Sequence, residues 1–172
     1  MIQLRDKSSR SCAMIKTAKA LKSVCREYKA LFIVNDRIDV AAACDADGVH
    51  IGQGDLDLNA ARQILGYGKA VGVSVTTIRQ ARRAKSRGAD YLGAGPVFTT
   101  PIKSGRPARG ISLLEKIKPL NIPFLAIGGI DTKNVARLTG RGIHSIAVIR
   151  AVCLAHDKAR AAGILKKALI GT

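Results

Sequence analysis

Two carboxylates have the residue type and the spacing needed to bind a divalent cation beside phosphate. Asp36 and Asp55 each follow a short apolar run, at 31–34 and 48–51, that is typical of a buried strand. In parallel α/β folds the chemistry lies where strands end and loops begin. Carboxylate oxygens, together with phosphate oxygens and water, are the ligands that Mg²⁺ prefers. The pair therefore predicts a Mg²⁺ site formed by Asp36 and Asp55.

Cationic side chains and a glycine pair supply groups that bind phosphate. Arg5 and Lys7 follow the first apolar run, and Lys103 lies in the long stretch after the fifth. Their charged groups form strong hydrogen bonds with phosphate oxygens. Gly128 and Gly129 precede a predicted helix and expose backbone N–H groups, a second phosphate cradle. These loops contain no cysteine and no Ser/His/Asp set, which argues against covalent catalysis. Two anion sites and a metal site indicate metal-assisted transfer between phosphorylated substrates.

Each feature also has an ordinary structural interpretation. Asn35 and Asp36 suit the N-cap of a helix in a generic protein, and a Gly-Gly pair is usually only a turn. His50, on an apolar strand, is more often a satisfied core histidine than a catalyst, and Met14 fits a core position. The 99–109 stretch also fits a plain surface loop.

The elements that must position these residues repeat along the chain. A β-branched run is followed by a polar turn and then by a stretch rich in Ala, Lys and Arg. Gly88 and Gly142 suit the left-handed position after a helix. The predicted strands are 2–4, 31–34, 48–51, 70–73, 91–94, 124–127 and 145–149, and the clearest predicted helices are 12–28, 77–87, 132–139 and 152–169.

Strands that alternate with helices predict right-handed βα units and a parallel sheet. An open doubly wound sheet and a (β/α)8 barrel both satisfy this pattern. Seven units in 172 residues average about 25 residues each, which is the size of a barrel unit. We therefore expect an α/β fold of the (β/α)8 TIM-barrel type, N-terminally truncated to about seven βα units, as a single domain over 1–172.

The charge is unusual for a globular chain. Lys and Arg number 29 against 12 Asp and Glu, which gives a net charge of +17. Such a charge favours anionic partners: phosphorylated small molecules, nucleic acid or an anionic surface. Aromatic residues make up only 3% and Trp is absent, which argues against base stacking on nucleic acid. The basic run Arg79, Arg82, Arg83, Lys85 and Arg87 fits a solvated outer helix face.

The remaining composition points to a cytoplasmic protein with no membrane span. No run of about 18 apolar residues occurs, and the first seven residues carry charges instead of an apolar signal core. The four cysteines have no C-x-x-C spacing and no accompanying histidine cluster, so free buried thiols are expected rather than zinc.

Taken in order, the motifs resemble the thiamine phosphate synthase/TenI family over essentially the whole chain. The matching blocks are QLRDK (3–7), FIVNDR (32–37), ADGVHIGQGDL (46–56), GVSVTT (72–77), GADYLGAGPVFTTPIK (88–103), IPFLAIGGI (122–130) and IAV (146–148). The resemblance implies a (β/α)8 barrel transferase of thiamine biosynthesis. It would couple hydroxymethylpyrimidine diphosphate to thiazole phosphate with Mg²⁺, giving thiamine phosphate and pyrophosphate.

The resemblance also implies a role for individual residues. Gln3, Arg5, Lys7 and Asn35 would hold the pyrimidine and its diphosphate, and Asp36 and Asp55 would bind Mg²⁺. Ser74 would approach the reacting pyrimidine. Thr100 and Lys103 would lie on a closing loop, with Lys103 on the diphosphate as a catalytic residue beside Ser74. Gly129 would donate its backbone N–H to the thiazole phosphate. The implied reaction is dissociative.

The sequence departs from the family pattern at four points. The family's first strand and helix have no counterpart, so we expect two unpaired sheet edges, and a homo-oligomer is left open. Ile102 stands where a threonine is common, within the segment Thr99-Thr100-Pro101-Ile102-Lys103, and Arg150 replaces a small residue near the thiazole-phosphate position. The excess positive charge is not a family requirement.

Two other functions remain open at this stage. One is a TenI-type thiazole tautomerase, although Gly95-Pro96 favours the synthase, because the tautomerase type often has His after that glycine. The other is a degenerate, non-catalytic barrel that binds phosphorylated ligands or nucleic acid through its charge.

Overall fold

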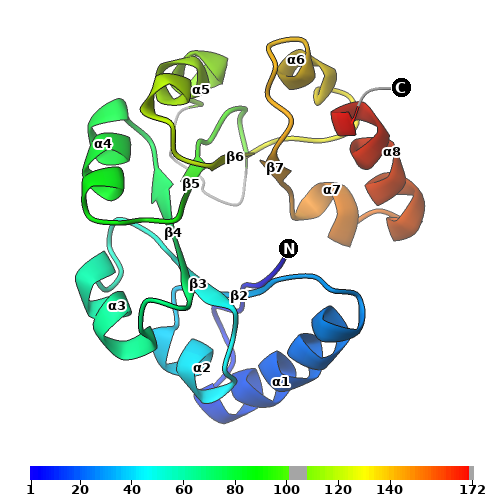
Figure 1. Cartoon of the computed structure of the whole chain (residues 1–172). Coiled ribbons are helices and arrows are strands. Elements are labelled where there is room, and N and C mark those ends of the chain that lie inside the picture. The colour runs from blue at the N-terminus through cyan, green and yellow to red at the C-terminus, as the bar shows by residue number, and fades with distance from the viewer. Residues whose placement is uncertain (101–107, 171–172) are drawn as a thin grey trace. The chain divides into compact units, whose positions relative to one another are not determined.

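A computed structural model describes residues 1–100 and 108–170 of the chain. The chain divides into two compact units, which are described separately (Figure 1). The first unit comprises residues 1–74 and 83–91, and the second comprises residues 75–82 and the described residues from Leu92 onward.

The first unit contains parallel strands that are neighbours in chain order. They are β1 (Ile2–Leu4), β2 (Phe32–Asn35), β3 (Gly48–Ile51) and β4 (Ala70–Val75), whose last residue belongs to the second unit. Leu4 is level with Val34, Asn35 with His50, and Ile51 with Val73. The carboxyl ends of these strands therefore form one edge, where the predicted site residues follow.

The helices of the first unit lie beside one another against these strands (Figure 1). They are α1 (Ser11–Glu27), α2 (Ile38–Ala43) and α3 (Leu58–Leu65), while α4 (Ile78–Ser86) crosses from the second unit into the first. Met14 and Ala18 of α1 are buried, as are Phe32, Ile33 and Val34 of β2. A strand that is apolar at successive positions is covered on both faces, so β2 is a core strand.

The second unit continues the same repeat. Its strands β5 (Tyr91–Ala94), β6 (Phe124–Ile127) and β7 (Ile146–Ala147) are parallel and adjacent in that order, with Tyr91 itself in the first unit. Buried Leu114, Ile117, Ala126 and Leu138 form its core. Its other described elements are α5 (Gly110–Ile117), the 3₁₀-helix η2 (Lys118–Leu120), α6 (Ala136–Thr139), α7 (Arg150–Cys153) and α8 (Lys158–Ile170).

Most predicted elements are confirmed, but three differ. The predicted helix over 132–139 is regular only at Ala136–Thr139, the predicted strand over 145–149 only at Ile146–Ala147, and the prediction of the last helix is wrong. In place of one helix over 152–169 there are two, α7 and α8. The Asp157 carboxylate accepts a hydrogen bond from the backbone N–H of Arg160 at 2.8 Å, and so caps a new helix. Gly88 and Gly142 have φ of +83° and +64°, which confirms their left-handed role. Among the described residues, no helix is both long and apolar enough to cross a membrane.

The cysteine prediction is half correct. All four thiols are free, and Cys25 and Cys44 are buried as expected. Cys12 and Cys153 are exposed, because Cys12 lies on the outer face of the first turn of α1 and Cys153 ends the short helix α7. The prediction that all of the cysteines are buried is therefore wrong for these two.

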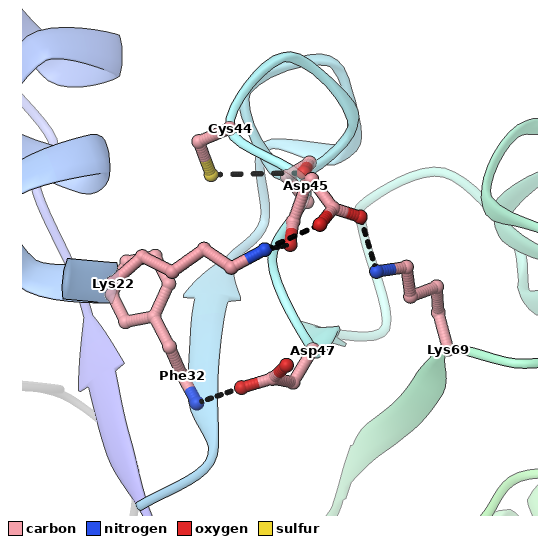
Figure 2. A network of polar contacts seen from close by, with 7 residues as sticks. Lys22, Phe32, Cys44, Asp45, Asp47 and Lys69 are labelled. Carbon is pink, nitrogen blue, oxygen red and sulfur yellow. Dashed lines mark hydrogen bonds and ion pairs between the residues drawn. The ribbon is translucent and has the colours of Figure 1, made fainter. Parts of the chain in front are cut away.

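A polar network stabilises the amino-terminal side of β2 and β3 (Figure 2). The Asp47 carboxylate accepts from the backbone N–H of Phe32 at 2.7 Å, where β2 begins. The Asp45 carboxylate binds the ammonium groups of Lys22 and Lys69, each at 2.5 Å. These two partners lower the pKa of Asp45 to about 2. Such placement at the strand starts is typical of a structural role in barrel-type folds, whereas the opposite ends carry chemistry.

Candidate active site

Lys7 and Asp36 are the first two predicted site residues that the structure brings together. They form an ion pair between the loop after β1 and the end of β2. The Asp36 backbone is in the left-handed region, at φ 64°, and its N–H donates to the carbonyl of His50 at 2.8 Å. This backbone turn sets the direction of the carboxylate, whose side chain is 20% exposed. The pair lies at the carboxyl edge of the strands, where residues of barrel-type folds carry chemistry.

The N-cap interpretation of these residues is not what the structure shows. The residue that precedes α2 is Arg37, and it makes no capping hydrogen bond through its side chain. Asn35 is the last residue of β2 and is half-buried. Asn35 and Asp36 therefore belong to the strand end and its turn.

Asp55 closes a tight turn after β3. Its Oδ2 accepts from the backbone N–H of Gly52 at 2.7 Å, and the Asp55 N–H donates to the carbonyl of Gly52. A Cβ atom at Gly52 would lie 2.9 Å from that same oxygen, so a side chain there would displace the Asp55 carboxylate. The carboxylate is exposed at the carboxyl edge of the sheet.

These two carboxylates fit a magnesium ion. In the described residues no three His, Cys, Asp or Glu side chains come together as a metal site. Mg²⁺ does not require such a cage, because it is usually bound by one or two carboxylates, substrate phosphates and water. Asp36 and Asp55 are oxygen donors at the ends of adjacent strands, which is the donor set this chemistry uses.

Ser74 is held from two sides near the end of β4. Its Oγ lies 2.9 Å from Nε2 of His50, and its carbonyl accepts from the Gln53 amide at 2.7 Å. His50 is 7% exposed, and its Nδ1 lies 3.2 Å from the hydroxyl of Tyr91. Burial raises the pKa of Tyr91, so its phenol stays protonated. The interpretation of His50 as a satisfied core histidine is confirmed, and its partner is a predicted site residue.

Gln3 and Arg5 have exposed side chains on and just after β1. A buried cation is costly without a ligand. Because the Arg5 guanidinium faces solvent, that cost does not arise here.

In the second unit, the turn after β6 is shaped by its two glycines. Gly128 and Gly129 have φ of +92° and +68°. A Cβ atom at Gly129 would lie 2.5 Å from the carbonyl oxygen of Thr99, so a side chain there is excluded. The Asn134 amide donates to the Gly129 carbonyl at 2.8 Å, and Asp131 Oδ1 accepts from the N–H of Asn134. This packing fixes the backbone of the predicted phosphate cradle.

Two further predicted positions lie on the carboxyl side of the second unit. Thr100 is half-buried, and Arg150 is the exposed first residue of α7. Lys103, and Ile102 beside it, lie outside the described residues.

The family model described as thiamine monophosphate synthase matches residues 1–152. The chain belongs to this family. A thiamine-phosphate synthase of Persephonella marina is 44% identical over 88% of this chain and 73% of its own length. One from Coprothermobacter proteolyticus is 43% identical over 96% of this chain and 79% of its own.

Longer relatives also match. The thiamine-phosphate synthase of Thermosynechococcus vestitus is 44% identical over 91% of this chain but only 45% of its own length. The chain thus spans about half the length of that relative. A solved structure, thiamine phosphate pyrophosphorylase from Pyrococcus furiosus, superimposes with a TM-score of 0.90 at 40% identity, over 98% of this chain and 81% of that one. The predicted α/β fold of the (β/α)8 TIM-barrel type is confirmed.

The sequence did not indicate the contact between Lys7 and Asp36 or the contact between His50 and Tyr91. A weak signal was available for the second contact. His50 and Gly72 are register partners, Ser74 is two residues beyond Gly72, and Tyr91 opens the next strand. Strand alternation places Gly72 and Ser74 on one face of the sheet. Glycine at position 72 has no side chain and so leaves room for the Tyr91 ring.

Proposed function

We propose that this chain is a thiamine phosphate synthase, a transferase. It couples hydroxymethylpyrimidine diphosphate with thiazole phosphate and releases pyrophosphate. The observation that carries the proposal is the Lys7–Asp36 pair at the carboxyl edge, with Asp55 after β3 and Ser74 near the end of β4. A cation, two carboxylates and a hydroxyl at one sheet edge match the needs of a diphosphate leaving group.

In the first unit, Arg5 and Lys7 bind the diphosphate with help from Asn35, while Gln3 contacts the pyrimidine. Their exposure on and beside β1 leaves them accessible to a ligand from solvent. Ser74 directs its hydroxyl to the reacting pyrimidine. Asp36 and Asp55 hold Mg²⁺, which when bound supplies positive charge to the phosphate oxygens.

In the second unit, the Gly129 amide binds the thiazole phosphate, within a turn whose backbone admits no side chain. Thr100 is a substrate-binding residue. Lys103 contacts the diphosphate, a role that rests on the sequence motif alone.

The reaction proceeds by heterolysis and capture. The bond between the methylene carbon and the diphosphate oxygen breaks, and pyrophosphate departs with the electron pair. The thiazole nitrogen then donates its lone pair to the methylene carbon of the pyrimidine cation. The cationic residues neutralise the developing charge on the leaving group, and exclusion of water protects the cation from hydrolysis.

The direct test is formation of thiamine phosphate by the purified chain. The chain is incubated with both substrates and Mg²⁺, with and without a chelator, and the product is separated and quantified. We expect product that requires both substrates and disappears with chelator. Conversion of the thiazole in the absence of pyrimidine substrate would instead identify a tautomerase. A folded chain without product, whose binding to nucleic acid falls steeply with salt and needs no Mg²⁺, would contradict the proposal.

A further inference from the structure

Ser74 is the end of a hydrogen-bonded chain that reaches into the core of the first unit. The chain runs from the Tyr91 hydroxyl to Nδ1 of His50 at 3.2 Å, and from Nε2 of His50 to Ser74 Oγ at 2.9 Å. The rings of Tyr91 and His50 also pack together, with their centroids 5.4 Å apart. Both residues are buried, at 7% exposure each, whereas Ser74 is half-buried.

The donor and the acceptor of each hydrogen bond between Tyr91, His50 and Ser74 can be assigned. Within the described residues, His50 is the partner of the Tyr91 hydroxyl. A buried phenol keeps its proton and must donate it, so Tyr91 donates to Nδ1. The ring proton of neutral His50 then lies on Nε2, because the two nitrogens of a neutral imidazole divide the donor and acceptor roles. Nε2–H donates to Ser74 Oγ, which leaves the Ser74 O–H group as an outward donor.

We propose that Tyr91 and His50 are positioning residues that fix the Ser74 hydroxyl as a donor toward the substrate. The expected effect of these residues on turnover rests on the proposed function. The direction of the hydrogen bonds does not. Without the Tyr91 hydroxyl, Nδ1 of His50 loses this donor, and the tautomer with its proton on Nδ1, which accepts from Ser74, is no longer opposed by that hydroxyl. The serine proton would then point inward, and the contact with the substrate would be weakened.

Gly72 makes room for this arrangement. It is the register partner of His50 on β4, and a Cβ atom there would collide with the ring carbons of Tyr91. The phenol ring therefore lies over the bare backbone of Gly72, where its hydroxyl reaches the His50 ring.

The tautomer of His50 tests the proposal without any turnover. The chain contains three histidines, so the His50 ring resonances can be assigned in ¹⁵N-labelled protein by comparison with His50→Gln. Long-range ¹H–¹⁵N spectra distinguish the two tautomers. We expect the Nε2–H form in the unmodified protein and a shift toward Nδ1–H in Tyr91→Phe, which keeps the ring and loses the hydroxyl. An Nδ1–H tautomer in the unmodified protein would overturn the proposal.

A double-mutant cycle on turnover tests the consequence. We expect Tyr91→Phe to lower kcat about threefold to tenfold, the value of one hydrogen bond, and to leave the KM for thiazole phosphate unchanged. In a Ser74→Ala background the same change should have no further effect. Tyr67→Phe is the matched control, because Tyr67 is 91% exposed.

An equal loss from Tyr91→Phe in both backgrounds would show that the hydroxyl acts by another route, and would overturn the positioning role. If the protein makes no thiamine phosphate at all, the proposed function fails. The tautomer measurement still decides the assignment in that case.

Discussion

At the scale of single residues, Asp36 is the most constrained of the candidate site residues. Its left-handed backbone, its ion pair with Lys7 and its N–H bond to His50 all act on one position. Non-glycine residues adopt a positive φ at a cost, and Asn and Asp tolerate it best. At the carboxyl edge of the sheet, where residues of barrel-type folds carry chemistry, a carboxylate fixed at such a backbone points to function.

The carboxylate of Asp36 can be removed without disturbing that backbone. Asp36→Asn keeps the shape and the tolerance for positive φ but removes the charge that faces Lys7 and Mg²⁺. We expect thiamine phosphate formation to fall about 100-fold, with thermal unfolding little changed. Asp39→Asn is the matched control, because Asp39 is exposed in the same region and pairs only locally with Arg37. Equal activity of both variants would remove Asp36 from the site.

Asp45 gives a prediction on pH. Its pKa is lowered from 3.8 to about 2 by Lys22 and Lys69. The unfolded chain therefore binds this proton first as the pH falls, so the stabilisation is present above about pH 4 and is lost toward pH 2. In urea titrations between pH 5 and 2, we expect Asp45→Asn to flatten the acid loss of stability relative to the unmodified protein (Figure 2). High salt should shrink the difference, and parallel pH curves would contradict the assignment.

How much of the site the sequence predicts depends on the kind of contact. The positions of Asp36 and Asp55 after successive strands, and of Ser74 near the end of the next strand, follow from the strand pattern alone. The Lys7–Asp36 contact depends on how the loop after β1 folds back, and no pattern specifies that. The His50–Tyr91 contact joins residues 41 positions apart. Lys103 remains a prediction from its motif.

At the scale of elements, the strands were easier to predict than the helices. The β5 and β6 bounds agree with the apolar runs, because buried parallel strands are continuous stretches of apolar residues. The helices α2, α3 and α5 have only 6 to 8 residues, too few for a clear helical period. On α4 the buried residues are Ala81 and Ala84, and the basic run is exposed as predicted.

Strand β4 supplies a prediction on packing. Gly72→Ala would place a methyl group against the Tyr91 ring, which is enclosed and cannot move freely. We expect a loss of about 1–3 kcal/mol in the free energy of unfolding, the usual cost of overpacking. Gly68→Ala is the matched control, since its Cβ would meet nothing within 4 Å. We expect that control to change stability by less than about 0.5 kcal/mol. Equal effects would show that the ring accommodates the methyl group.

At the scale of the whole molecule, the dominant feature is the net charge of +17. In the described residues, seven of the 29 basic residues make the ion pairs that the structure shows, so most of the positive charge is not used in such pairs. Many of the others lie on exposed helix faces, as Arg79, Arg82 and Arg83 do on α4. A protein with this excess attracts anions over distances comparable with the Debye length.

Both proposed substrates carry phosphate, so this field should assist their binding. The Debye length falls from about 30 Å at 10 mM salt to about 8 Å at 150 mM. We expect the KM for the pyrimidine diphosphate to rise about tenfold over this range, while kcat stays constant because the contacts at the reacting atoms are short. Replacing exposed Arg79 and Arg82 with Gln lowers the net charge to about +15 and should weaken the salt dependence without changing kcat. A KM that is independent of salt would mean that the outer charges do not act on the substrates, and that only the residues at the carboxyl edge bind them.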